Sequence, residues 1–297
     1  GMREVGMLPT AGPGLREVAE GHDTAGIAAA AASGELTALY LMHVDPLRSL
    51  PNRPLWEQAL EKATTVIAHA SFLTEGIREH ATVVFPAEAY AEKEGTITHP
   101  DGRLQRVRSA VAHPGDVRAE WQVLEDLSAR VGIEVRTLTA AQAFSRLSAE
   151  VPFYATINLD GIGGRGIRWP ERNGPLWPRG DEGPFGLEMP PYAPTPNGSL
   201  RLGTYRSIWA SPEVDVSPAL KFLAARQVVE LHPDDAAHVG VGHGDRVVAA
   251  ADGHRVHGRV HLRSDAPVGT AFLQSGTRED SASELPPGSG LVEITRA

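Results

Sequence analysis

Glycine and proline are concentrated in the middle of this sequence, and that concentration limits how the chain can fold. Between Val151 and Leu200, 18 of 50 residues are Gly or Pro. Neither residue suits the interior of a helix or a sheet. The hydrophobic pattern before this stretch also differs from the pattern after it. We therefore predict an α/β domain over residues 1–150, an irregular connecting segment over 151–199 and a second domain over 200–297.

Short apolar runs alternate with helical patterns in the first part. Strands are expected at 38–43, 65–70 and 82–85. Helices are expected from Thr24, Asn52 and Thr74, over 118–131, and from a capping box of Thr139 and Gln142. Strands that alternate with helices indicate a mostly parallel sheet with both faces covered.

The last part contains short strand patterns separated by turn residues. Strands are expected at 228–231, 246–250, 256–262 and 270–274, with one short helix at 234–239. Several short strands and a single helix in under 100 residues are typical of a small β-barrel rich in antiparallel pairs.

Composition excludes several classes of function. The sequence contains no cysteine, so disulfides, cysteine-bound clusters and a thiol nucleophile are excluded for this chain. The formal net charge of −9 argues against nucleic acid as a partner. No apolar run approaches the roughly 18 residues of a membrane span, so direct membrane insertion is not expected.

One glycine motif matches the pattern of nucleotide-binding loops. Residues 161–166 have the spacing G-x-G-x-x-G. A dinucleotide loop needs a strand before the motif and a helix after it. Pro170 and Pro175 prevent that helix. We therefore expect a flexible loop carrying Arg165, Arg168 and Trp169.

Two sets of polar side chains have the spacing of reactive sites. His257 and His261 share a strand face near His254, but no third ligand converges on them, so a solvated face is expected rather than a metal site. Glu88 and Glu92 are spaced for one helix face, yet Lys93 and Glu94 adjoin them, so an exposed helix end is expected. No catalytic residue and no metal ligand is predicted.

Several segments resemble the molybdopterin oxidoreductases. Residues 68–75 (AHASFLTE) and 80–86 (HATVVFP) resemble the family segment D-x-F-x-T-E-T-A-x-x-A-D-V-V-L-P. Residues 92–96 (EKEGT) and 102–105 (GRLQ) resemble a second family pattern. Residues 229–236 and 240–247 are similar to the family's dinucleotide-binding β-barrel, which implies a double-psi barrel. Residues 163–169 are similar to the large iron–sulfur subunit of NADH–quinone oxidoreductase, or complex I.

The resemblance implies a cofactor groove at the ends of strands. The matching positions are His43, Asp45, Ser71, Thr74, Arg103 and Gln105. His43-Val44-Asp45-Pro46 departs from the family's G-x-N-P, however, because it has neither the glycine nor the asparagine. An aspartate repels a pyrophosphate. The groove is therefore expected to be vestigial, without molybdopterin and without any other cofactor.

The resemblance also implies a role. We expect the non-catalytic structural portion of the large iron–sulfur subunit, a scaffold within the electron-input arm. Its partners would be the other subunits of the peripheral arm, on the cytoplasmic side of the inner membrane. Iron–sulfur clusters would lie in an N-terminal part of the parent subunit. Two alternatives remain: part of a molybdopterin-dinucleotide oxidoreductase similar to formate dehydrogenase, or a free-standing binding module.

Overall fold

The computed structural model describes residues 7–10, 12, 18–99, 103–168, 198–286, 288 and 290–297. The chain forms two compact units, and each consists of two separate stretches. The first unit joins Gly1–Ile27 to Phe85–Met189, and the second joins Ala28–Val84 to Pro190–Ala297. The boundaries expected at 150 and 199 remain predictions about domains along the sequence. The compact units instead reflect which stretches pack together.

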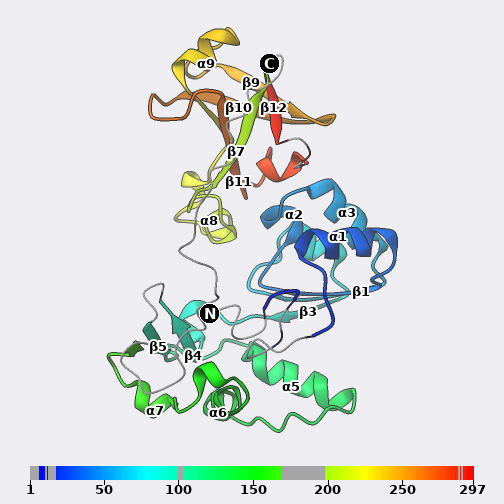
Figure 1. Ribbon diagram of the computed structural model, residues 1–297, viewed down its shortest axis with the longest axis vertical. Helices are drawn as coiled ribbons and strands as arrows, with labels where there is room; N and C mark the ends of the chain where they lie inside the picture. Colours follow the sequence, from blue (N-terminus) through cyan, green and yellow to red (C-terminus); the bar gives the residue numbers. More distant parts are fainter. Residues whose placement is uncertain are drawn as a thin grey trace. The chain divides into compact units, whose positions relative to one another are not determined.

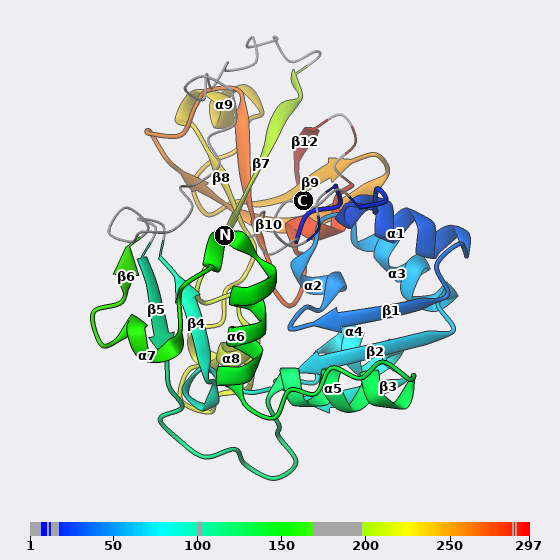
Figure 2. The same cartoon turned by 60° about the horizontal axis from the view of Figure 1, so that its bottom comes forward.

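A three-stranded sheet lies in the second unit. β1 (Ala38–Met42) pairs in parallel with β2 (Thr65–Ala70), from Ala38 opposite Thr65 to Met42 opposite His69, and β3 (Val83–Pro86) completes the order β1-β2-β3. The accompanying helices are α1 (Thr24–Ser33), α2 (Pro46–Ser49), α3 (Arg53–Lys62) and α4 (Glu75–His80). α1 and α3 lie along the same side of this sheet (Figure 1, Figure 2). The predicted parallel sheet is thereby confirmed.

Six strands of the second unit close into a barrel in the order β10-β8-β11-β7-β12-β9. Their bounds are β7 Leu200–Arg206, β8 Val228–Leu231, β9 Arg246–Ala251, β10 His254–Leu262, β11 Thr270–Ser275 and β12 Leu291–Arg296. Two of the pairs, β10 with β8 and β11 with β7, are parallel, and the other four are antiparallel. This is a double-psi barrel, as predicted. The short helices are α8 (Pro212–Val216), η6 (Lys221–Leu223), α9 (Pro233–His238) and η7 (Ala282–Glu284).

The barrel has an apolar core and a buried amide beside it. Val229, Leu231, Val247 and Leu273 are fully buried in its core. Gln227, which is 6% exposed, lies at the start of β8 and uses its whole amide. Its Nε2 donates to the carbonyls of Gln274 (2.8 Å) and Asp280 (2.6 Å), and its Oε1 accepts from the N–H groups of Val228 (3.0 Å) and Gln274 (2.8 Å). The Gln227 side chain thus connects the beginning of β8 with the end of β11.

The first unit is built on a small antiparallel sheet. β4 (Gly95–Thr98) pairs with β5 (Arg103–Val107), which pairs with β6 (Ile167–Arg168). The other elements are η2 (Tyr90–Glu92), α5 (Glu120–Arg130), α6 (Ala140–Glu150), η3 (Pro152–Tyr154) and α7 (Leu159–Ile162). Leu104, Phe144 and Ile162 are buried together in its core. The described part of the expected irregular segment, 151–168, therefore contains short regular elements.

The glycine motif and the histidine cluster lie in different units of the structure. α7 precedes most of the glycines of residues 161–166 and β6 follows them, which is the reverse of a dinucleotide loop; Trp169, Pro170 and Pro175 lie outside the described residues. His257 contacts Asp280, and the ring of His261 packs edge-on against His243. Within the described ranges, no group of three His, Asp or Glu side chains is arranged to hold a metal ion.

The expectation for Glu88 and Glu92 was wrong. Glu88 is 4% exposed and lies 2.7 Å from Nε2 of His113. Glu92 accepts a hydrogen bond from the N–H of Ala89 at the start of η2. The observed helix does not include Glu88, which lies in the loop between β3 and η2, where its carboxylate is paired with His113. Separately, none of the described helices has the length and apolar character that a membrane crossing requires.

Substituting Gln227 tests the polar tie inside the barrel. Gln227→Met keeps the volume but leaves several buried backbone groups without partners, so we expect a loss of about 2–4 kcal/mol in unfolding free energy. Urea unfolding measures this. The control is Gln122 on α5, and Gln122→Met should change stability by no more than about 0.5 kcal/mol. Equal effects of the two substitutions would contradict the assignment.

Candidate functional site at the strand ends

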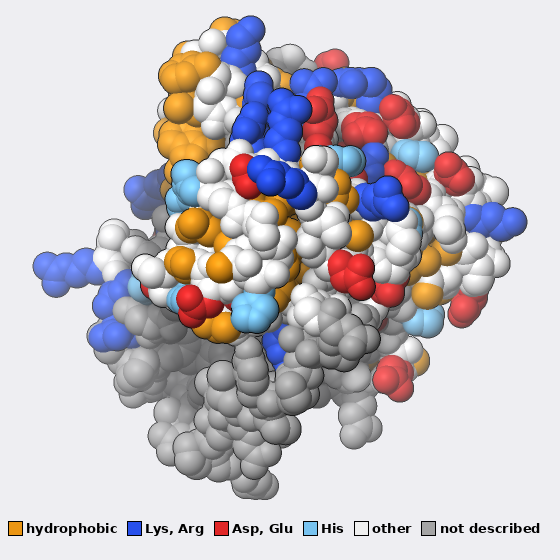
Figure 3. All heavy atoms as spheres, turned by 90° about the horizontal axis from the view of Figure 1, so that it is seen from above, with side chains coloured by type: hydrophobic (Ala, Val, Ile, Leu, Met, Phe, Trp, Pro, Cys, Tyr) orange, Lys and Arg blue, Asp and Glu red, His pale blue; other side chains and the backbone are white. Residues whose placement is uncertain are grey.

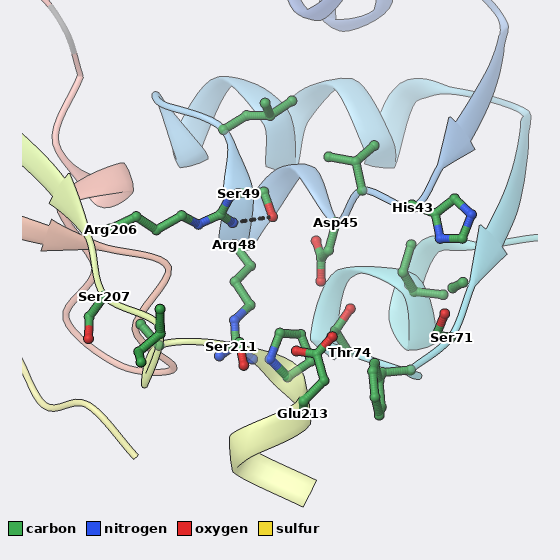
Figure 4. Close-up of a pocket in the computed structure, with 18 residues that line it drawn as sticks. His43, Asp45, Arg48, Ser49, Ser71, Thr74, Arg206, Ser207, Ser211 and Glu213 are labelled. Carbon is green, nitrogen blue, oxygen red and sulfur yellow. Dashed lines mark hydrogen bonds between the residues drawn. The ribbon is translucent and has the colours of Figure 1, made fainter. Parts of the chain in front are cut away.

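A cavity of about 640 Å³ lies within the second unit. Its walls are the loop and helix that follow β1, the loop that follows β2, and the segment 206–213 that follows β7 (Figure 4). The carboxyl ends of parallel strands are where open α/β sheets bind their ligands. The topology therefore makes this cavity the first candidate for a binding site.

His43 directly follows β1 and has a backbone conformation that favours glycine. Its φ is +53°, in the left-handed region that residues with a Cβ rarely adopt. The family pattern G-x-N-P has glycine at this position. The backbone conformation of this turn is therefore enough to account for the glycine of the family pattern, without a ligand.

Asp45 is buried, with 7% of its surface exposed, and its carboxylate serves two helices. Oδ1 accepts from the N–H of Leu47 (3.0 Å) in α2, and Oδ2 accepts from the N–H of Gly76 (3.1 Å) in α4. These N–H groups belong to the first turns of their helices, where the chain itself offers no acceptor. The carboxylate therefore takes the place that an anion would otherwise have at these helix ends.

Gly76 makes this contact possible. A Cβ at residue 76 would lie 2.3 Å from Oδ1 of Asp45. No atom pair of this kind can approach so closely without a shift, and the carboxylate is too buried to move freely. Glycine at residue 76 is therefore required for packing.

Two arginines reach the cavity from different elements. Arg48 of α2 forms an ion pair with Asp215 (2.7 Å), and its Nε donates to the carbonyl of Gly276 (3.0 Å). Arg206, at the end of β7, donates to Oγ of Ser49 (3.1 Å), the bond drawn in Figure 4. Burial raises the pKa of the neighbouring Tyr205 to about 12, so its phenol stays protonated. The arginine contacts hold the strand-end loops against the barrel.

The structure brings four of the six predicted groove residues together. His43, Asp45, Ser71 and Thr74 all line the cavity. Thr74 is the N-cap residue of α4 but its side chain makes no capping bond. Arg103 and Gln105 lie on β5, in the first unit, where Arg103 donates to the carbonyl of Arg165 (2.9 Å).

Sequence reasoning missed four polar residues of the cavity, one from α2 and three from the segment that begins at the end of β7. Arg48, Arg206, Ser211 and Glu213 line the cavity, yet none lies in a motif that we recognised. Arg206 is the last residue of β7, a strand that the sequence did not predict, and α2 was not predicted either. An arginine at the end of a strand was the only available signal.

Comparison with known proteins finds two family models that match parts of the chain. Residues 3–130 match the model "Molybdopterin oxidoreductase", and residues 200–296 match "Molydopterin dinucleotide binding domain". The chain therefore contains a region of the molybdopterin oxidoreductase type and a domain of the molybdopterin-dinucleotide-binding type. It is also similar in fold to acetylene hydratase from Pelobacter acetylenicus, with a TM-score of 0.70, 14% identity, and coverage of 94% of this chain and 47% of that one.

The curated relatives are longer proteins. The chain is 32% identical to NADPH-Fe(3+) oxidoreductase subunit alpha of Geobacter sulfurreducens (88% of this chain, 30% of the relative). It is 26% identical to the G-type subunit, form 2, of NADH-quinone oxidoreductase from Rhizobium meliloti (94% and 34%). It is 25% identical to F420-dependent formate dehydrogenase 1 subunit alpha of Methanococcus maripaludis (96% and 47%). The chain thus spans between three tenths and half of each relative.

Substitution of His43 tests the backbone explanation of the first turn. His43→Gly should be more stable than His43→Ala by about 1 kcal/mol, because both remove the side chain but only glycine adopts a positive φ without strain. Thermal unfolding of the two variants provides the comparison. Equal stability of glycine and alanine at residue 43 would contradict the assigned conformation.

Gly76→Ala tests the packing around Asp45. We expect a loss of about 2–4 kcal/mol, because the new methyl group displaces a buried carboxylate that holds two helix ends. Gly95→Ala is the control, since a Cβ there meets no atom within 4 Å, and it should change stability by about 0.5 kcal/mol or less. Denaturant unfolding distinguishes the two, and a harmless Gly76→Ala would show that the contact is dispensable.

Proposed function

We propose that this chain is a non-catalytic structural part of the large iron–sulfur subunit of an NADH–quinone oxidoreductase. It would act as a scaffold in the electron-input arm, with the other subunits of the peripheral arm as its partners. The observation that carries the proposal is the double use of the Asp45 carboxylate. In the cavity expected to hold the cofactor, the Asp45 carboxylate already accepts the hydrogen bonds that a phosphate would accept.

The cavity residues do not fit the pyrophosphate of a pterin dinucleotide. The first-turn N–H groups of Leu47 and Gly76 already donate to Asp45. Pyrophosphate at these helix ends would have to displace a buried carboxylate and would be repelled by it. The residues at the ends of β1 and β2 therefore favour a cavity without the dinucleotide.

The charges of the cavity agree with this proposal. Arg48 is neutralised by Asp215. Arg206 remains as a cation, but Glu213 lines the same cavity. Together with Asp45, these groups give the strand-end cavity no excess of positive charge, whereas sites for phosphates are usually cationic.

A scaffold must hold its own parts together, and the second unit does so through side chains. Arg48 connects α2 to the residues after β11, Arg206 connects β7 to Ser49, and Oγ of Ser283 donates to the carbonyl of Leu47 (3.5 Å). The likeness to the Rhizobium meliloti NADH-quinone oxidoreductase chain over 94% of this sequence supports the assignment to that type of protein. The location that goes with it is a peripheral position on the cytoplasmic side of the inner membrane.

A second candidate function is part of a pterin-dinucleotide oxidoreductase similar to formate dehydrogenase. The favouring observation is the exposed guanidinium of Arg206 beside Ser49, Ser207 and Ser211, in a cavity large enough for a nucleotide. The likeness to a formate dehydrogenase subunit over 96% of this chain agrees with it. The two candidates differ in whether this cavity takes a nucleotide.

Calorimetric titration separates the two. With GDP or isolated molybdopterin guanine dinucleotide, we expect no saturable binding that Arg206→Ala weakens, because Asp45 already occupies the helix ends of the strand-end cavity. Micromolar binding that Arg206→Ala abolishes, and that Arg255→Ala on the outer face of β10 leaves intact, would contradict the scaffold proposal. That result would instead support the molybdopterin enzyme.

A further inference from the structure

A second and larger cavity lies on the barrel, away from the strand ends of the sheet. Its volume is about 910 Å³, and it is lined by residues from the segments 215–227, 246–247, 257–259 and 278–280 and by Ala297. None of the residues of the first cavity lines it. We name it the barrel groove. Neither the motifs of the sequence nor the proposed scaffold function assigns a role to it.

The barrel groove is lined by cations in a chain whose net charge is −9. Lys221, Arg226, Arg246, Arg259 and Arg278 all line it. Cationic side chains also gather in a group on the face of the molecule shown in Figure 3, with acidic ones scattered among them. Positive charge concentrated in a hollow attracts anions.

The acidic groups near these cations are few and largely occupied. Asp215 pairs with Arg48, and Asp280 contacts His257. Asp245, next to Arg246 in sequence, pairs with Arg296 (3.3 Å) and accepts from the N–H of Gly242. Glu279 is the remaining acidic side chain of the groove. In the described part of the chain, Lys221, Arg226, Arg246 and Arg278 form no ion pair.

Two of the arginines face each other across neighbouring strands. Arg246 of β9 and Arg259 of β10 are directly opposite in the antiparallel register. Like charges in that position destabilise a sheet. Nη1 of Arg259 donates to the carbonyl of Gly244 (3.0 Å), which fixes the guanidinium without cancelling its charge. An anion between the two guanidinium groups would remove the repulsion.

An aromatic ring borders the same cations. Phe222 of η6 lines the groove and is 79% exposed, so its ring is open to solvent. Flat aromatic faces bind nucleobases by stacking, and guanidinium groups bind phosphates with paired hydrogen bonds. The barrel groove presents both features in one concave surface.

We propose that the barrel groove binds a nucleoside diphosphate. Arg246 and Arg259 hold the phosphates, Arg226 and Arg278 add positive charge, and Phe222 stacks on the base. A concave site with several arginines suits a compact ligand that bears closely spaced charges. An acidic peptide, by contrast, spreads its charges along an extended chain and gains nothing from an aromatic face. The proposal does not depend on the scaffold function, because the two cavities share no residue.

Calorimetric titration of the full chain with ADP tests the proposal. We expect saturable binding of one ADP, weakened as salt rises because ions screen the arginines. Arg246→Gln and Arg259→Gln should each weaken it about tenfold, the effect of about 1.4 kcal/mol. The control is Arg255→Gln, on the same face of β10 but outside the groove, which should change the affinity less than about twofold. Phe222→Ala should lower the affinity for ADP but leave the affinity for pyrophosphate unchanged, because pyrophosphate has no base to stack on the ring.

Several outcomes would overturn the proposal. One is the absence of saturable binding of both ADP and pyrophosphate at low salt, with unfolding curves showing an intact barrel. Another is an equal loss of affinity in Arg255→Gln and Arg246→Gln. Binding of a hexaglutamate peptide in preference to ADP would assign the groove to a protein partner. Binding that Arg206→Ala abolishes but Arg246→Gln does not would place the ligand in the strand-end cavity.

Discussion

The carboxylate of Asp45 joins two helices that follow neighbouring strands of one sheet. α2 follows β1 and α4 follows β2, and each begins with N–H groups that its own helix cannot satisfy. One buried side chain supplies the acceptors for both. Gly76 has no Cβ because the carboxylate needs that space. The shape of the strand-end cavity and its lack of excess positive charge both follow from this arrangement.

Arg48 extends the same arrangement to the barrel. It lies one turn after Asp45 on the helix that Asp45 caps, so the cap also places its guanidinium against Asp215 and the carbonyl of Gly276. Loss of the cap would therefore disturb the contact between the strand-end loops and the barrel. In this unit, a group at the usual ligand position connects structural parts, which is why a scaffold is the function we favour.

The two cavities differ in how their charges are balanced. At the strand ends, Arg48 has an acidic partner and Arg206 shares its cavity with Glu213. In the barrel groove, two arginines face each other across a strand pair while nearby carboxylates are engaged elsewhere. Uncompensated charge costs stability in the free protein. Its presence on the barrel, away from the family's expected groove, is the reason to look for a ligand there.

The sequence by itself determined the parallel sheet and most of the barrel, because alternating patterns, helix caps such as Asn52 and turn residues such as Gly240 act locally. It also supplied His43, Asp45, Ser71 and Thr74, which follow strands that were correctly placed. It did not supply β7, β12 or α2, whose short patterns are weak and which depend on partners far along the chain. Only the tertiary structure decided that Glu88 is buried, that Arg48 meets Asp215 across 167 positions of sequence, and that Arg246 faces Arg259. Burial and pairing of charges depend on which distant segments pack together, and no local pattern encodes that.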